Sequence, residues 1–407
     1  MKKQILSILL TCVIAGGLTG CGNLKQDQDA PVFTANPVPV SEAAVTQTDF
    51  ALDLLKEAYL QNPQQNVLLS PYSAMQALAM AANGAGGNTR TEMEQTLGGI
   101  PLDSLNASLR DLRDKLTSDR SCTFRSANAS WVISPDGNNH LNPDFDKIVS
   151  QGYDAKLSFG LLDEAARREI NQWCSENTDQ MIPEIVTGEI PDTTALMLLN
   201  AACFEGKWKQ AFRSVYNDGT FIRYDGKEQT VPMMTASEKY YLAGENMKGF
   251  VKYYTGDFAF AAILPDEDME HYLPTLKPED LRKMLMHVKE ASTPFDVVLP
   301  KFSLECRTDM VPLLKNMGMT SAFDGDTADF SRTLEDPAPL WIGEAYQSVY
   351  IEVDQEGTKA AAGTVVSEES CAPERIAFDR PFLYMIVETK NMTPLFTGVF
   401  NEVPGAS

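Results

Sequence analysis

The run from Glu352 to Val366 constrains the fold more than any other part of the chain, because strand-forming residues lead into small residues without a proline. Surface loops normally carry Pro, Asn and larger polar side chains. In steps of two from Thr358 to Val366, every side chain on one face is small or β-branched, whereas Lys359 lies on the other face. The pattern predicts a segment that is able to enter a sheet as an extra strand with one face buried.

The size and charge of the chain indicate a large acidic globular protein. Its 407 residues are 43% hydrophobic, which is ordinary for a folded domain. The 56 acidic and 34 basic residues give a net charge of −22, and this charge opposes binding to nucleic acid and to anionic membranes. No linker-like composition appears after about residue 47, so we expect a single domain over residues 47–407.

The N-terminus has the pattern of an export signal. Lys2 and Lys3 precede a short apolar run that ends in Leu18-Thr19-Gly20-Cys21. This ending resembles the bacterial lipobox, which implies cleavage before Cys21 and acylation of that residue. An ordinary signal peptide and a membrane span are the alternatives, although the run is short for a span.

The predicted organisation is therefore a signal peptide over residues 1–20 and a Pro-containing tether over residues 21–46. Removing the signal leaves 32 − 56 = −24 charges. The lipobox resemblance implies an exported protein, lipid-anchored to the bacterial cell envelope and facing the surface or the periplasm. Its contact with the membrane would be through the lipid alone.

The remaining cysteines show no metal-ligand spacing and no deducible pairing. Five are left once Cys12 is removed and Cys21 is acylated, and the odd number leaves at least one free thiol. Cys203, between Ala202 and Phe204, is predicted to be a small core residue. These five are Cys122, Cys174, Cys203, Cys306 and Cys371.

The hydrophobic periodicity predicts helices mainly in the first half and strands mainly in the second, which favours an α+β fold over regular βαβ alternation. A helix is expected after Ser70 as N-cap with Pro71 at its first position, ending at Asn83-Gly84, and a capping box at residues 89–92 is expected to open the next. The other predicted helices are 49–62, 104–118, 142–152, 163–178, 278–290 and 307–317. The predicted strands are 128–133, 196–204, 251–254, 258–264, 295–299, 348–353, 382–388 and 395–400.

Motifs for catalysis are missing from the sequence. It has three histidines, none beside a plausible nucleophile, and no G-x-S-x-G, phosphate-loop or dinucleotide motif. The glycine-rich residues 84–87 follow a predicted helix and fit its C-terminal turn. We therefore predict no catalytic, cofactor or metal site, although a pair of carboxylates brought together in space remains an open alternative.

Five ordered blocks of sequence lie at residues 66–73, 199–208, 299–302 with 318–323, 378–386 and 394–398. The first reads as a strand that leads into a helix, and the second is a strand end of the form N-A-x-x-F-x-G-x-W. Together the blocks resemble the serpin family over about residues 47–404, and the fourth resembles the family signature. The resemblance implies about eight or nine helices around three β-sheets, a large central sheet and an exposed reactive-centre loop at about residues 355–377.

The resemblance also implies a mechanism. Serpins are suicide substrates: a protease attacks a bait bond, forms an acyl-enzyme, and the cut loop inserts as a new strand into the central sheet, which distorts the protease before deacylation. Insertion requires small hinge residues, since a proline removes a ladder donor and a charge would have to be buried. The hinge residues implied here are Gln355, Glu356, Gly357, Thr358, Ala360, Ala361, Ala362, Gly363 and Thr364.

Other roles are carried over by matching positions. Ser70, Ser73 and Asn200 match a polar cluster beneath the opening sheet, and Trp208 matches an aromatic residue near the point of loop entry. Gln347 stands where many members have His. Gln355 replaces the hinge acid that is expected to pair with Lys301, which implies a weaker latch.

Counting along the loop places the bait bond at Cys371-Ala372, whereas counting backwards from Phe378 places it at Ser370-Cys371. A Cys or Ser on the acyl side suits a small or shallow apolar pocket. The implied partners are extracellular serine proteases of elastase-like, chymotrypsin-like or subtilisin-like type, with papain-like cysteine proteases as secondary partners and a monomeric inhibitor. The competing hypotheses are a non-inhibitory serpin that acts as a binding module, and a hydrolase.

Overall fold

The computed structural model describes residues 40–118, 121–133, 140–191, 194–357 and 375–405. Within these ranges nine α-helices are found, and the predicted helix over residues 142–152 divides into a short α-helix and the π-helix Ile148–Tyr153. The helices are α1 (Val40–Gln61), α2 (Pro71–Asn83), α3 (Gly87–Thr96), α4 (Leu102–Ser118), α5 (Pro143–Lys147), α6 (Glu164–Asn177), α7 (Met269–Thr275), α8 (Pro278–Met286) and α9 (Met310–Asn316). None of these described helices is long and apolar enough to cross a membrane.

A five-stranded sheet, hereafter the central sheet, has the order β10-β11-β4-β2-β3. The neighbouring inner strands β11 and β4 run parallel, and β10 and β2 flank them in antiparallel pairs. The strands are β2 (Cys122–Ile133), β3 (Lys156–Gly160), β4 (Leu196–Gly206), β10 (Phe302–Asp309) and β11 (Ile342–Val353).

The other strands form one nine-stranded sheet with the order β1-β14-β13-β8-β7-β6-β9-β12 and β5 paired to β6. Two continuous sheets are therefore present where three were expected, because the 17-residue β6 pairs with β5, β7 and β9 along its length. The strands are β1 (Val67–Leu69), β5 (Ser214–Ile222), β6 (Glu228–Gly244), β7 (Met247–Tyr253), β8 (Phe258–Pro265), β9 (Lys289–Pro300), β12 (Arg375–Ala377), β13 (Phe382–Glu388) and β14 (Thr393–Phe400).

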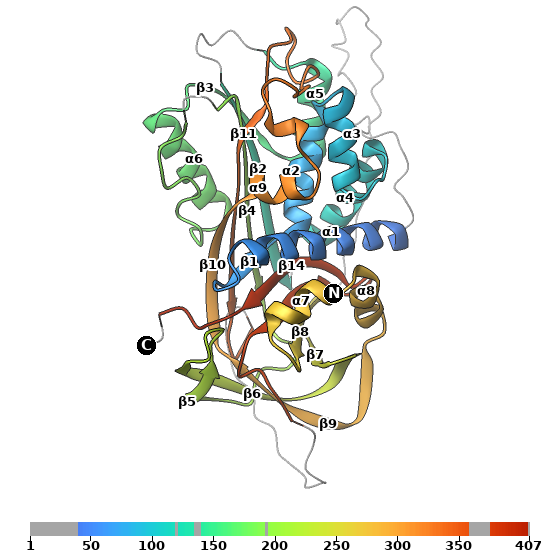
Figure 1. Cartoon of the computed structure of the whole chain (residues 1–407), viewed down its shortest axis with the longest axis vertical. Helices are drawn as coiled ribbons and strands as arrows, with labels where there is room; N and C mark the ends of the chain where they lie inside the picture. The colour runs from blue at the N-terminus through green and yellow to red at the C-terminus, as the bar shows by residue number, and fades with distance from the viewer. Residues whose placement is uncertain (1–39, 119–120, 134–139, 192–193, 358–374, 406–407) are drawn as a thin grey trace, which may run out of the picture. The chain divides into compact units, whose positions relative to one another are not determined.

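Helices cover both faces of the central sheet (Figure 1). Every residue of α2 is buried, and Leu198 and Ala202 of β4 belong to the core cluster that includes this helix. The alternate residues Met197 and Leu199 instead pack with Ile170 of α6 in a second cluster. The side-chain alternation of β4 thus places α2 and α6 on opposite faces.

The first helix begins earlier than the sequence indicated. α1 starts at Val40, so residues 40–46, which were expected in the tether, are helical, and Thr46, Gln47 and Thr48 are buried. The prolines that favour a tether end at Pro39, and no helix-breaking residue follows before the predicted start.

The predicted capping box at residues 89–92 is wrong. α3 begins at Gly87 with Gly86 as N-cap, so Thr89 lies inside the helix. The Glu92 carboxylate accepts hydrogen bonds from the backbone N–H groups of Thr320 and Ser321 at 2.8 and 2.7 Å. The Glu92 side chain therefore makes a tertiary contact and does not cap the N-terminus of the helix as the capping box predicted.

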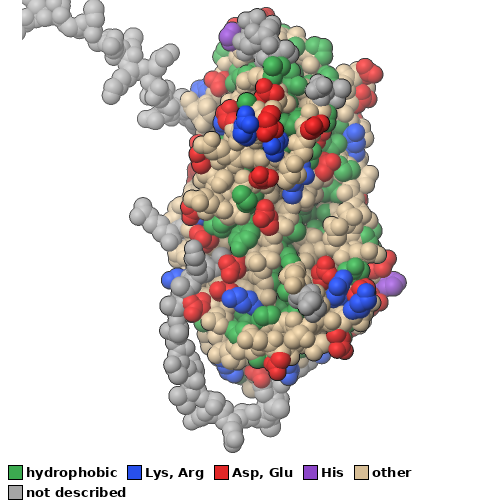
Figure 2. Space-filling model, turned by 90° about the vertical axis from the view of Figure 1, so that its left-hand side faces the viewer, with side chains coloured by type: hydrophobic (Ala, Val, Ile, Leu, Met, Phe, Trp, Pro, Cys, Tyr) green, Lys and Arg blue, Asp and Glu red, His purple; other side chains and the backbone are tan. Residues whose placement is uncertain are grey.

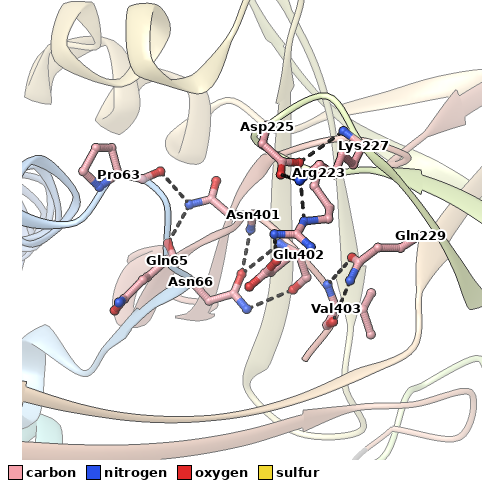
Figure 3. Close-up of polar contacts among 10 residues, drawn as sticks. All are labelled: Pro63, Gln65, Asn66, Arg223, Asp225, Lys227, Gln229, Asn401, Glu402 and Val403. Carbon is pink, nitrogen blue, oxygen red and sulfur yellow. Dashed lines mark hydrogen bonds and ion pairs between the residues drawn. The ribbon is translucent and has the colours of Figure 1, made fainter. Parts of the chain in front are cut away.

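The side chain of Asn66, which precedes β1, forms hydrogen bonds with the residues that follow β14 (Figure 3). Its Oδ1 accepts from the backbone N–H groups of Asn401 at 2.7 Å and Glu402 at 3.1 Å, and its Nδ2 donates to the Glu402 carbonyl at 2.9 Å. Arg223 pairs with the Glu402 carboxylate at 2.8 Å. Hydrogen bonds of the Asn66 side chain thus extend the pairing of β1 with β14 to the two residues that follow β14.

Candidate functional site

The candidate site begins at the parallel pair of β4 and β11 in the middle of the central sheet. The register aligns Leu199 with Tyr346 and Phe204 with Ile351, and β11 ends at Val353. The next strand among the described residues is β12, on the edge of the nine-stranded sheet. Residues 358–374 between them lie outside the described residues, and with them the small hinge residues from Thr358 to Thr364 and the predicted bait bond at Cys371-Ala372 or Ser370-Cys371.

The described part of the hinge, residues 355–357, and Asp354 before it are held by hydrogen bonds to their main chain. The backbone N–H of Trp208 donates to the Glu356 carbonyl at 3.2 Å, and that of Phe212 donates to the Gln355 carbonyl at 2.8 Å. The indole Nε1 of Trp208 donates to the Asp354 carbonyl at 2.8 Å. Trp208 therefore touches the hinge, as the resemblance implied.

Gly357 is the last described residue before the loop, and its position requires glycine. It forms an isolated bridge with Lys207. Its φ is +119°, and a Cβ there would lie 2.3 Å from the Gly206 carbonyl oxygen. The backbones of the hinge and of the segment after β4 approach too closely for any side chain.

At position 355 the resemblance implied an acid paired with Lys301, and Gln355 stands in its place. Gln355 is exposed, and among the described residues no hydrogen bond joins its side chain to Lys301. The Lys301 backbone N–H instead donates to the Pro232 carbonyl at 2.9 Å. A neutral amide has too little attraction for an ammonium to hold an exposed side chain in place, so the main-chain bonds from Trp208 and Phe212 hold this part of the hinge.

The predicted polar cluster is present beneath the parallel pair. Gln347 of β11 accepts from the Ser70 N–H through Oε1 at 2.9 Å. Its Nε2 donates to the Ser70 carbonyl at 3.0 Å and to Asn200 Oδ1 at 2.6 Å. The amide thus bridges the start of α2 to β4 and uses both its donor and its acceptor.

Asn200 extends the same cluster across β4. Its Nδ2 donates to Ser73 Oγ at 2.5 Å and to Asn128 Oδ1 at 2.7 Å. The Ser73 hydroxyl in turn shares a 2.5 Å hydrogen bond with Ser126. Ser70 begins α2, as predicted, but its hydroxyl donates to the Leu395 carbonyl at 2.8 Å and forms no side-chain cap.

Sequence reasoning missed several members of the site. Ser126 and Asn128 come from β2, which began six residues earlier than the predicted strand, and Phe212 lies in a segment to which no motif pointed. Lys252 also lies beside the hinge contacts, and its charge within the apolar stretch Phe250-Val251-Lys252 was the signal that could have found it.

The described cysteines are free thiols, and three of the four are buried. Burial raises the pKa of Cys203 to about 12, as it does for Cys174, and Cys203 is fully buried as predicted. Thiols with such pKa values are inert at neutral pH. Cys21 and Cys371 lie outside the described residues.

Comparison with known proteins identifies the family. The family model described as "Serpin (serine protease inhibitor)" matches residues 45–403. Bovine Serpin B8 is 31% identical over 368 residues, which cover 87% of this chain and 97% of that protein. The leukocyte elastase inhibitor of Xenopus laevis is 31% identical over 372 residues, covering 87% of this chain and 98% of that protein.

A solved structure gives the same result. The native state of the thermophilic serpin tengpin superimposes with a TM-score of 0.82 at 32% identity, covering 88% of this chain and 94% of tengpin. The chain belongs to the serpin family, and its fold class is that of a serpin.

Replacing Gln347 by histidine is expected to make the stability depend on pH. Gln347 is 1% exposed and meets a backbone N–H on one side and two acceptors on the other. A neutral imidazole can accept from Ser70, but an imidazolium cannot, so the folded-state pKa would fall below the unfolded value of about 6.5. Stability would be fully present above pH 6.5 and would be lost by up to about 1.4 kcal/mol per pH unit below it.

The measurement is the denaturant midpoint of the Gln347→His variant and of the wild type between pH 5 and 8. The variant should lose stability relative to the wild type as the pH falls through 6.5. Parallel profiles for the two proteins would show that position 347 tolerates an imidazolium.

Proposed function

We propose that this serpin is an extracellular suicide-substrate inhibitor of serine proteases of elastase-like or subtilisin-like type. The observation that carries the proposal is the continuity of β11 with a hinge that leads into Thr358, Ala360, Ala362 and Thr364. This face contains no charge and no proline, so it meets the demands of a strand that must enter between β4 and β11.

Main-chain hydrogen bonding favours insertion of the loop after cleavage. A strand placed between β4 and β11 exchanges one ladder for two, and each additional main-chain hydrogen bond contributes about 0.5–1.5 kcal/mol net. About a dozen such bonds make a large driving force. While the loop is uncut, a kinetic barrier keeps the protein in its native state. The hydrogen bond between Gln347 of β11 and Asn200 of β4 is part of that barrier, because it joins the two strands that must separate.

We place the bait bond at Cys371-Ala372, with Ser370-Cys371 as the neighbouring alternative. The small side chain on the acyl side supports proteases with a small or shallow apolar pocket. The name of one relative, leukocyte elastase inhibitor, is in line with this choice. Arg375, the next basic residue, lies beyond the bond, so trypsin-like proteases are expected to be poor targets.

The inhibitor is proposed to be exported and attached to the bacterial cell envelope through an acylated Cys21, with its loop directed at proteases outside the cytoplasm. Figure 2 shows Lys and Arg side chains interspersed among Asp and Glu on the face viewed, so the charge of that face offers no alternative means of membrane attachment. The Cys21→Ser variant is expected to move from the membrane to the soluble fraction without losing inhibition. Retention of the variant in the membrane would contradict the lipid anchor.

The test is incubation of the full-chain inhibitor with elastase-like, subtilisin-like, chymotrypsin-like, trypsin-like and papain-like proteases, followed by denaturing electrophoresis and mass spectrometry of the released peptide. We expect a complex that survives SDS with an elastase-like or subtilisin-like enzyme, and a released peptide that begins at Ala372 or Cys371. Complete turnover without a complex would favour the non-inhibitory binding module instead.

A further inference from the structure

A buried ion pair lies beside the hinge contacts. Lys252 of β7 is 2% exposed, and its Nζ lies 2.5 Å from Oε1 of Glu238 on β6. Burial lowers the pKa of the Lys252 ammonium and raises the pKa of the Glu238 carboxyl. Two charges at such a position are costly to desolvate, and apolar residues of similar size would usually serve stability as well or better.

The ammonium of Lys252 also faces two aromatic rings. Its Nζ lies 4.5 Å from the ring centroid of Phe212 and 5.5 Å from that of Trp208. The two rings contact each other edge to face at 5.8 Å, and the indole stacks on Tyr254 at 4.1 Å. A desolvated cation within about 6 Å of a ring is attracted to its face, so the Lys252 ammonium attracts both rings.

The same two aromatic residues carry the hydrogen bonds to the hinge. Trp208 donates to the carbonyls of Asp354 and Glu356, and Phe212 donates to that of Gln355. These bonds set the position of residues 354–356, from which a loop strand would enter between β4 and β11. The structure therefore links Lys252 to the hinge through the Trp208 indole, which faces the ammonium and donates to Asp354, and through the backbone N–H groups of the two ring-bearing residues.

We propose that the Lys252–Glu238 ion pair is a positioning device that slows release of the hinge, in place of an acid at position 355. The proposal rests on the proposed function, since it concerns the barrier to loop insertion. Arg213, the other charge that acts on Glu238, is about half exposed and lies 3.7 Å from Asp296. Lys252 is therefore the cation that is buried with Glu238 under the aromatic rings.

The test uses the full-chain double variant Lys252→Met/Glu238→Gln, which removes both charges without leaving one unpaired. Uncleaved protein is held at a moderately raised temperature, and conversion to an inactive, loop-inserted form is followed by residual inhibition and native electrophoresis. We expect about a tenfold faster conversion than in the wild type, because the cation–π attraction to two rings is lost. The single variant Lys252→Arg, which keeps a cation, is expected to convert at a rate close to that of the wild type.

The matched control is Lys390→Met/Asp257→Asn, which removes an exposed ion pair of 3.0 Å and is expected to leave the rate unchanged. If the ion pair had only a structural role, its loss would destabilise the native and the loop-cleaved forms equally. The melting temperature of the cleaved double variant is therefore also measured. We expect it to match that of the cleaved wild type. A conversion rate within twofold of wild type, or equal destabilisation of both forms, would overturn the proposal.

Failure of the inference is distinguishable from failure of the proposed function. A wild type that forms SDS-stable complexes, with an unchanged rate in the variant, overturns the ion-pair proposal alone. A wild type that neither forms complexes nor converts on heating overturns both. If the double variant does not fold, Phe212→Leu removes the nearer ring and is expected to accelerate conversion in the same way.

Discussion

Replacing Thr358 by arginine is expected to convert the inhibitor into a substrate. Thr358 follows Gly357 directly and is the first residue of the small face that must be buried on insertion. Burying a guanidinium without a partner costs several kcal/mol, and each 1.4 kcal/mol added to the insertion barrier slows insertion about tenfold. Deacylation would then occur before the protease is distorted.

The measurement is the stoichiometry of inhibition, the number of inhibitor molecules consumed for each protease inactivated. We expect it to rise at least about 100-fold in Thr358→Arg, while the rate of loop cleavage stays near that of the wild type. Lys359→Arg is the matched control, because this neighbour falls on the other face and should change the stoichiometry less than twofold. Equal stoichiometries for Thr358→Arg and wild type would contradict burial of that face.

Removing the side chain of Asn200 is expected to destabilise the native state by about 3 kcal/mol. A buried side chain that makes three hydrogen bonds leaves its partners unsatisfied when it is lost, at about 1–3 kcal/mol for each group. The partners here are Gln347 Nε2, Ser73 Oγ and Asn128 Oδ1. Because Gln347 and Asn200 join the two strands that must part, opening of the sheet should also become easier.

The variant Asn200→Ala is compared with the wild type by denaturant unfolding and by the rate of polymer formation on warming. We expect a lower midpoint and at least tenfold faster polymerisation. Ser126→Ala, at the edge of the same cluster, should cost only about 1 kcal/mol. If the two variants behaved alike, the contact between Asn200 and Gln347 would not be what keeps β4 and β11 together.

The sequence predicted those parts of the fold that are encoded locally. The strand over residues 382–388 and the helix from Pro71 to Asn83 have the predicted bounds, because their apolar patterns are uninterrupted. The hairpin of β5 and β6 was missed although Asp225-Gly226, with Gly226 at φ +78°, is a turn signal. The Glu92 contact was beyond local reasoning because its partners are more than 200 residues away.

The candidate site was predictable through resemblance for Ser70, Ser73, Asn200 and Trp208. The hydrogen bonds of Gln347 were not, because they depend on the register that places β11 beside β4 and above the start of α2. The weaker latch implied at Gln355 stays a prediction, and the bonds from Trp208 and Phe212 to the hinge could be found only in three dimensions.

The central claim, insertion of the cleaved loop between β4 and β11, is tested most directly by thermal unfolding of the native and the loop-cleaved protein. A protease that the protein does not inhibit is used to cut within residues 365–374, and the two forms are melted side by side. We expect the cleaved form to melt more than about 10 °C above the native form, because the inserted strand adds about a dozen hydrogen bonds. A cleaved form that melts at or below the native temperature would contradict insertion.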